Sequence, residues 1–268
     1  MTERPGPPKP RHLQPDQGLQ FAEVEVASAY RHRPPYAPEV VDVVLELLGP
    51  PPHRVLELGA GSGDFTTLLA DRVDTVVAVE PSEPMRALGE QRTVAAPASV
   101  TWEGVSSEDF RPDGSYSAAV AAESLHWMDW EVVLPMLAGC LREGGPLAVI
   151  GRGLATTPPW AKELQAIIDR YSTNVHYREH DLIADLESRG LFERQGDHET
   201  EPTVFRQPLE EYVESFHSRN GFSRARMTPE NARAFDQQVA ELVAGHVEGD
   251  EVELMTVTSV TWGRPRLR

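Results

Sequence analysis

The sequence predicts a doubly wound α/β fold with a mostly parallel sheet. Short apolar strands alternate with helices between residues 54 and 151, which is the pattern of parallel sheets with helices on both faces. These strands show no polar alternation, so both of their faces should be buried. A glycine-rich turn at residues 59–63 joins the first strand to the next helix, as expected where such a sheet binds a ligand.

Each element follows from its hydrophobic pattern and from the residues at its ends. Residues 38–48 place apolar side chains at helical spacing after Pro38, and Gly49 followed by prolines ends that helix. The expected core elements are strands at 54–58, 75–80, 100–104, 116–122 and 147–151, and helices at 64–72, 83–90 and 129–141. After Gly153 the expected elements are helices at 160–171, 180–189, 209–217 and 229–244, an extended segment at 199–205 and a strand at 252–262.

The composition limits the classes of protein to which this chain can belong. Of its 268 residues, 40% are hydrophobic and 25% are charged, which is typical of a globular protein. The formal net charge of −17 opposes binding to phosphate backbones, so we expect no nucleic-acid partner. Cys140 is the single cysteine, which excludes an internal disulfide and a cysteine-based zinc site, and we expect no metal.

The chain shows no signal for a membrane or for export. Its apolar stretches are far too short to cross a bilayer, and its first residues do not resemble a signal peptide. We therefore expect a cytoplasmic protein without a membrane partner, either a monomer or a homodimer. Residues 1–18 are rich in proline and polar residues, and we expect this lead to be disordered.

The glycine-rich turn reads Glu57-Leu58-Gly59-Ala60-Gly61-Ser62-Gly63-Asp64. A strand that leads through such a turn into a helix exposes backbone N–H groups and the positive end of the helix dipole, which favour a negatively charged ligand group. Dinucleotide-binding folds use Gly-x-Gly-x-x-Gly at this place, with the third glycine packed near a pyrophosphate. Asp64 occupies that third position, which disfavours an NAD-dependent oxidoreductase but leaves it as the alternative.

The Glu-x-Gly-x-Gly-x-Gly pattern resembles motif I of class I S-adenosylmethionine-dependent methyltransferases. Further landmarks follow in the family's order at 81–85, 106–110, 112–116 and 141–147, so the resemblance covers about residues 28–151. It implies a Rossmann-like, doubly wound sheet of seven strands, mostly parallel with an antiparallel last strand, plus helical cap elements. It also implies a cofactor-binding core at 19–153, and a substrate cap with the last two strands at 154–268.

The resemblance also assigns S-adenosyl-L-methionine as cofactor and places its contacts. Glu57 would face the ammonium and sulfonium end, and Glu80 would bind both ribose hydroxyls. Tyr30 or Arg33 would hold the methionine carboxylate, because an arginine can pair with it through two hydrogen bonds. The expected cofactor residues are Tyr30, Arg33, Glu57, Gly59, Ala60, Gly61, Glu80, Pro81, Met85, Ser107, Glu108 and Glu123.

The segment after the strand at 116–122 indicates where the methyl acceptor binds. It reads Glu123-Ser124-Leu125-His126-Trp127-Met128-Asp129 and resembles a stretch of the branch that includes trans-aconitate methyltransferase. His126 is the candidate catalytic base or substrate hydrogen-bond donor, and a purely structural histidine is the alternative. The expected substrate residues are Tyr36, Trp127, His217 and Arg219.

We therefore predict methyl transfer to a small molecule, with O-methylation of a hydroxyl or carboxylate favoured. Such an in-line displacement mainly requires aligned reactants and the exclusion of water. A base is needed only where the acceptor must lose a proton. A non-catalytic module that binds the cofactor and a protein methyltransferase remain alternatives.

Overall fold

The apolar strands of the first half of the chain pair in parallel. The computed structural model describes residues 8–247 and 249–267. Its strands are β1 (Arg54–Leu58), β2 (Thr75–Val79), β3 (Ser99–Glu103), β4 (Ala118–Ala122), β5 (Leu147–Leu154), β6 (Phe192–Glu199), β7 (Thr203–Pro208) and β8 (Glu251–Pro265). Their order is β3-β2-β1-β4-β5-β8-β6, and β7 also pairs with β8. The pairs among β1 to β5 are parallel and those of β8 are antiparallel, which confirms the predicted fold class.

The strand count differs from the prediction, since the described residues form an eight-stranded sheet rather than one of seven. β6 lies where the sequence predicted no strand, and β7 spans 203–208 instead of the predicted 199–205. Of the eight residues of β6, only Phe192 is buried and only Gly196 is intermediate. An exposed edge strand of this kind buries neither face, so it leaves no hydrophobic alternation for sequence analysis to detect.

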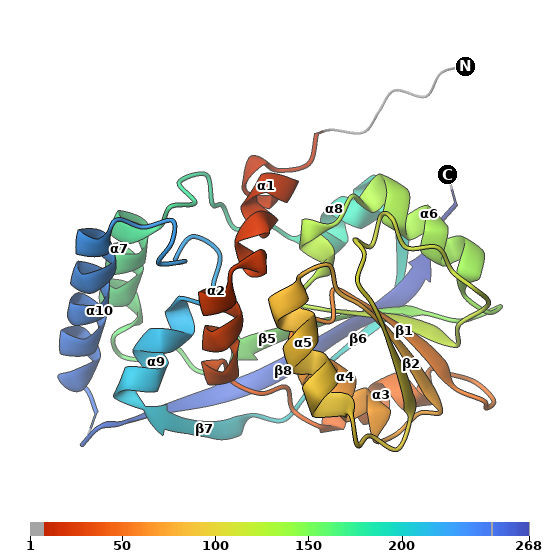
Figure 1. Ribbon diagram of the computed structural model, residues 1–268, viewed down its shortest axis with the longest axis horizontal. Helices are drawn as coiled ribbons and strands as arrows, with labels where there is room; N and C mark the ends of the chain where they lie inside the picture. The colour runs from red at the N-terminus through yellow and green to blue at the C-terminus, as the bar shows by residue number, and fades with distance from the viewer. Residues whose placement is uncertain (1–7, 248, 268) are drawn as a thin grey trace.

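Helices cover both faces of the sheet (Figure 1). They are α1 (Pro15–Gly18), α2 (Val24–Ala29), α3 (Glu39–Glu46), α4 (Asp64–Ala70), α5 (Glu83–Thr93), α6 (Trp130–Cys140), α7 (Ala161–Tyr171), α8 (Leu182–Ser188), α9 (Leu209–Phe216) and α10 (Pro229–Ala244). α3 and α4 pack on one face around Val55 and Val76, whereas α6 and α8 pack on the other around Leu56 and Val77. None of these described helices is both long and apolar enough to span a membrane.

Helices α7, α9 and α10, which we call the cap helices, form a second core beside the sheet (Figure 1). Phe235 of α10 is fully buried there, with ring centroids 5.6 Å from Phe216 and 4.8 Å from Phe222. Val252 and Leu254, at the start of β8, belong to this second core, whereas Val260 of the same strand belongs to the sheet core. β8 therefore contributes residues to both the sheet core and the core of the cap helices.

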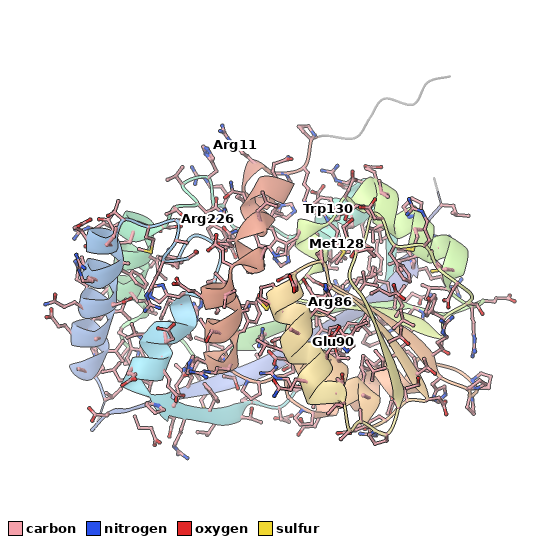
Figure 2. The ribbon with its side chains drawn as sticks, viewed as in Figure 1. Arg11, Arg86, Glu90, Met128, Trp130 and Arg226 are labelled. Carbon is pink, nitrogen blue, oxygen red and sulfur yellow. The ribbon has the colours of Figure 1, made fainter. Side chains whose placement is uncertain are left out.

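The N-terminal segment is ordered further than the sequence predicted. Residues 1–7 of the expected disordered lead lie outside the described residues, but residues 11–22 form short helical turns in which Leu13 is buried. Lys9 donates a hydrogen bond to the carbonyl of Met128 over 2.9 Å and lies 4.9 Å from the ring centroid of Trp130, both labelled in Figure 2. These tertiary contacts order the segment. The sequence did not predict them, because the segment is rich in proline and has no regular amphipathic pattern.

The second core yields a stability prediction. Phe235→Ala should lower the free energy of unfolding by about 3–5 kcal/mol, because it leaves a cavity among packed aromatic rings. The control is Arg233→Ala on the exposed face of the same helix, where the side chain is 75% exposed and the expected change is within about 0.5 kcal/mol. Urea unfolding monitored by circular dichroism measures both. Equal midpoints for the two variants would contradict a packed core between the cap helices.

Candidate active site

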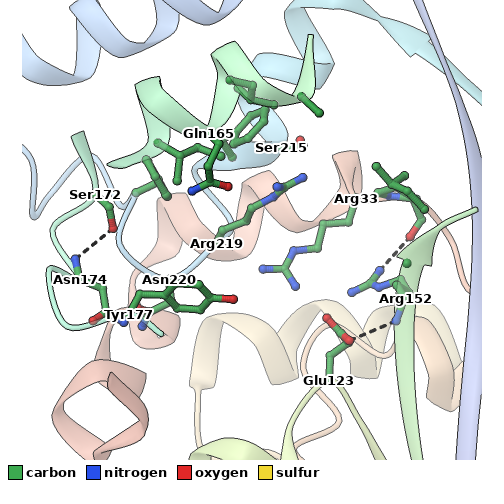
Figure 3. A pocket seen from close by; sticks show the side chains of 18 of the residues that line it. Arg33, Glu123, Arg152, Gln165, Ser172, Asn174, Tyr177, Ser215, Arg219 and Asn220 are labelled. Carbon is green, nitrogen blue, oxygen red and sulfur yellow. Dashed lines mark hydrogen bonds between the residues drawn. The ribbon is translucent and has the colours of Figure 1, made fainter. Parts of the chain in front are cut away.

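A cavity of about 930 Å³ opens at the carboxyl edge of the parallel strands. Its walls come from the N-terminal segment, from the segment after β4, from β5 and from the cap helices (Figure 3). Six of the residues predicted from the sequence border it, namely Tyr30, Arg33, Glu123, His126, Trp127 and Arg219. Ligands of open α/β sheets bind at this edge, so the cavity is the candidate active site.

The glycine-rich turn lies beside this edge in the conformation that only glycine adopts easily. Gly59, Gly61 and Gly63 have φ of +65°, +57° and +79°, in the left-handed region that disfavours side chains. A Cβ on Gly59 would lie 2.5 Å from the Cβ of Ser124, so the turn packs tightly against the segment after β4. A Cβ on Gly61 would meet no atom within 4 Å. The backbone at Gly61 is therefore open to an incoming ligand.

Glu80 fixes the turn to the end of β2. Its carboxylate accepts hydrogen bonds from the backbone N–H of Gly61 over 2.9 Å and of Ser82 over 2.8 Å. Burial raises the pKa of Glu80, and these two hydrogen bonds oppose that effect. Each carboxylate oxygen can accept a further hydrogen bond, so the predicted contact with ribose hydroxyls is compatible with this arrangement.

Glu57 lies beneath the turn rather than on the cavity wall. Its residue surface is 1% exposed, and its Oε2 atom has no hydrogen-bond partner. Burial raises the pKa of Glu57 to about 8, and the nearby Asp64 and Glu80 add to the effect. A buried carboxyl with an unsatisfied oxygen is costly to the stability of the fold, and the contact of Glu57 with the cofactor stays a prediction.

Five further predicted cofactor residues lie in the segments that follow β1, β2 and β3. Met85 is buried against α2, Ala60 and Ser107 are buried, and Pro81 is exposed. Glu108 accepts a hydrogen bond from the backbone N–H of Asp129 over 2.6 Å. None of these five borders the cavity, so their cofactor contacts remain a prediction.

Arg33 and Tyr30 form one wall of the cavity. The Arg33 guanidinium lies 4.0 Å from the ring centroid of Tyr30 and donates to the hydroxyl and the carbonyl of Ser218 over 2.7 and 2.6 Å. Burial raises the pKa of the Tyr30 hydroxyl, so this hydroxyl stays protonated. Arg33 is thereby fixed in place with its remaining nitrogen available to a ligand.

Glu123 and Arg152 border the cavity next to Arg33 (Figure 3). Glu123 is the single described residue other than glycine with positive φ, at 55°, and its Oε1 accepts a hydrogen bond from the backbone N–H of Arg152 over 3.1 Å. Arg152 donates to the carbonyl of Pro34 over 2.9 Å. The sequence analysis missed Arg152, although a charged residue inside an otherwise apolar strand was a usable signal.

His126 borders the cavity as an uncharged imidazole. Burial lowers its pKa to about 4, and the positive charges of Lys9 and Arg33 act in the same direction, against Glu123. Its ring centroid lies 4.6 Å from that of Trp127. Above pH 5 the ring is neutral, so it can accept a proton from a hydroxyl or hold a hydrogen bond.

Two predicted substrate residues lie outside the cavity. Tyr36 is buried in the sheet core with its ring 5.3 Å from that of Phe65. His217 is buried, with Nε2 2.6 Å from Asp236 and Nδ1 2.7 Å from the carbonyl of Phe222. Both side chains are engaged in packing or internal hydrogen bonds, so the structure supports a structural role for them. In the sequence, the polar groups of Tyr36 and His217 could not be distinguished from groups that contact a ligand.

Comparison with known proteins identifies the core of this chain. The family description "Methyltransferase domain" matches residues 55–145. This part of the chain is therefore similar to a methyltransferase domain. An uncharacterised methyltransferase of Mycobacterium tuberculosis is 36% identical over 58% of this chain and 61% of its own length. The trans-aconitate 2-methyltransferase of Variovorax paradoxus is 33% identical over 43% of this chain and 49% of its own. The chain therefore spans less than two thirds of the length of these relatives.

Solved structures of methyltransferases are similar in fold to most of this chain, and not only to residues 55–145. A protein of Anaeromyxobacter dehalogenans described as a type II methyltransferase superposes with a TM-score of 0.60 at 21% identity, covering 87% of this chain and 99% of that one. An S-adenosylmethionine-dependent methyltransferase of Geobacter sulfurreducens, in complex with S-adenosyl-L-homocysteine, superposes with a TM-score of 0.51 at 17% identity over 92% and 98%. The fold is that of class I S-adenosylmethionine-dependent methyltransferases.

The buried carboxyl of Glu57 yields a pH prediction. Its pKa rises from the ordinary 4.5 to about 8 on folding, so between these values the folded protein binds more protons than the unfolded chain. The free energy of unfolding therefore falls as pH rises through this range. Glu57→Gln should remove this contribution and make the ligand-free protein more stable than wild type at pH 8.

Urea unfolding of both proteins from pH 5 to pH 8 measures the effect as a difference, so that contributions from other groups cancel. The two curves should converge toward pH 5 and separate toward pH 8. Parallel curves would show that Glu57 does not titrate differently in the two states.

Proposed function

We propose that this protein transfers the methyl group of S-adenosylmethionine to a small-molecule acceptor, with an oxygen atom as the favoured acceptor. The observation that carries the proposal is the position of the cavity. It borders Glu123, which follows β4. The glycine-rich turn, which leaves Gly61 open and is tied to Glu80, does not line the cavity itself but packs against Ser124, the next residue of that segment. A concave site of about 930 Å³ suits a small molecule better than a protein surface or a nucleic acid.

The residues at the carboxyl edge suit the cofactor. Glu80 is positioned for the ribose, and Arg33 with Tyr30 for the methionine carboxylate. Glu123, at the end of β4, supplies a negative charge for the ammonium group. When bound, the cofactor supplies a sulfonium-activated methyl group. The chain's own task is then to align the acceptor with that methyl group and exclude water.

His126 is the residue best placed to assist an oxygen acceptor. It is neutral, it borders the cavity, and it lies three residues after Glu123 on the same segment. A neutral imidazole can accept the proton that an acceptor hydroxyl loses as its oxygen attacks. Its lowered pKa makes it a weak base, so its contribution includes positioning the hydroxyl through a hydrogen bond.

The dinucleotide alternative finds less support. Asp64 is the first residue of α4 and occupies the position of the third glycine in the dinucleotide pattern. It forms an ion pair with Arg92 of α5. Arg92 also donates to the carbonyl of Ser62 over 2.9 Å. A carboxylate held at this helix start would oppose a pyrophosphate.

Calorimetric titration with S-adenosylhomocysteine, and in parallel with NAD and NADP, tests the cofactor. We expect binding of S-adenosylhomocysteine alone. Gly61→Val should lower this affinity at least about 100-fold, because the side chain fills the open space. The positive φ separately costs the folded variant about 1–2 kcal/mol of stability. Circular dichroism shows whether the variant folds. A folded variant with unchanged affinity would exclude the turn as the cofactor site.

A second prediction concerns His126. With an acceptor that shows turnover, His126→Ala should lower kcat by about 100-fold and leave the affinity for S-adenosylhomocysteine unchanged. His198→Ala, at an exposed position of β6, is the matched control. The wild-type rate should show no ionisation near pH 6.5, because the ring loses its proton at about pH 4. Unchanged turnover of the alanine variant would remove His126 from the mechanism.

A further inference from the structure

Arg219 is a cation without a counter-ion inside the cavity. It follows α9 and borders the cavity from the side of the cap helices, opposite Glu123 (Figure 3). Among the described residues no acceptor or acidic group pairs with its guanidinium, whose one recorded contact is the ring of Phe216, 4.2 Å away. Arg33 and Arg152, by contrast, donate to Ser218 and to Pro34.

Arg219 is surrounded by protein, yet its side chain has open surface facing the cavity. Burial lowers the pKa of Arg219 to about 10, and the positive charges of Arg33 and Arg152 contribute to this. An arginine remains charged at neutral pH even so. Because Arg219 is an exposed residue at the cavity, its charge is hydrated in the ligand-free protein and is available to pair with an anionic ligand group.

The charge of the cavity is opposite to that of the whole protein. Its described lining holds the arginines 33, 152, 178 and 219 against the acids Glu123 and Asp169. The two lining histidines, His12 and His126, have lowered pKa values and are neutral. A net positive cavity in a chain of formal charge −17 is a local arrangement that selects anions.

The wall beside Arg219 is apolar. Leu164 and Ile168 of α7, Tyr212 and Phe216 of α9, and Leu254 of β8 border the cavity. Although α7 packs in the core of the cap helices, none of its residues is fully buried. Tyr212, Phe216 and Leu254 are buried in that core, whereas Leu164 and Ile168 keep partly exposed apolar surface at the cavity. This surface favours an apolar ligand group.

We propose that the acceptor is an amphipathic anion, with a carboxylate or phosphate group paired to Arg219 and an aliphatic or aromatic body packed against α7 and α9. This inference rests on the proposed function for its assignment to the acceptor, since the same cavity continues to Glu123 and His126. Arginine pairs with both anions through two parallel hydrogen bonds, so the two groups share one recognition chemistry.

Calorimetric titration of the full chain, saturated with S-adenosylhomocysteine, tests the proposal. The probes are straight-chain carboxylic acids of four to ten carbons, the matching amides, and alkyl phosphates of the same lengths. The acids or the phosphates should bind more tightly than the amides, and the tighter of the two series identifies the anionic group. Affinity should rise by up to about fourfold for each buried methylene until the apolar wall is covered.

Variants locate the anionic group. Arg219→Gln should weaken binding of the charged probes at least about tenfold, while leaving the affinities for the amides and for S-adenosylhomocysteine unchanged. Arg219→Lys should restore part of the loss, because it retains the charge. The control is Arg233→Gln, which removes one exposed charge from α10 and should change none of these affinities.

The outcomes separate this proposal from the proposed function. Amides that bind as tightly as acids would overturn the anionic group, and affinity independent of chain length would overturn the apolar body. A loss of S-adenosylhomocysteine binding in Arg219→Gln would assign Arg219 to the cofactor and overturn the proposal. Failure of wild type to bind S-adenosylhomocysteine would instead contradict the proposed function, and the same titrations without it would still test the cavity.

Discussion

The length of β8 is the constraint on which the arrangement of this protein depends. Residues 256–263 pair with β5, while residues 251–256 continue past the carboxyl end of β5 and pair with β7. The pairing with β5 fixes this extension in direction and register. Val252 and Leu254 then anchor the cap helices to it. Backbone hydrogen bonds of the sheet therefore hold the cap helices over the edge where the parallel strands end, and the cavity forms between them.

Most of the fold could be predicted from the sequence because the parallel strands are buried on both faces. Residues 55–58 and 76–79 are all buried, and apart from Glu57 they are all apolar, while glycines and prolines lie near the ends of these runs. β6 escaped prediction because its exposed residues carry no periodic signal. The helical turns at 11–22 escaped because distant partners stabilise them, for example Asn220, which donates to the carbonyl of Gln17 over 2.6 Å. Local sequence cannot report such partners.

The candidate site likewise contains residues that the sequence could locate and residues that it could not. The glycine-rich turn, Glu80, Glu123 and His126 could be located because a strand end and a turn define where backbone and side chain must point. Arg219 was a candidate on residue type alone, whereas His217, two residues earlier, turned inward to Asp236. Along an irregular segment no periodicity tells which side chain faces a cavity. The apolar wall of α7 emerged only when the cap helices and the sheet were seen together.

The N-terminal segment touches both halves of the cavity. The carbonyl of Phe21 accepts a hydrogen bond from Ser82, at the start of α5, over 2.8 Å, and Gln20 accepts one from the backbone N–H of Gly221 over 3.2 Å. Figure 1 shows α2 between α5 and α9. The same short stretch therefore closes the cofactor side and the acceptor side. Under the proposed function, any movement of this stretch would alter the cofactor side and the acceptor side at the same time, because it is hydrogen-bonded to both Ser82 and Gly221.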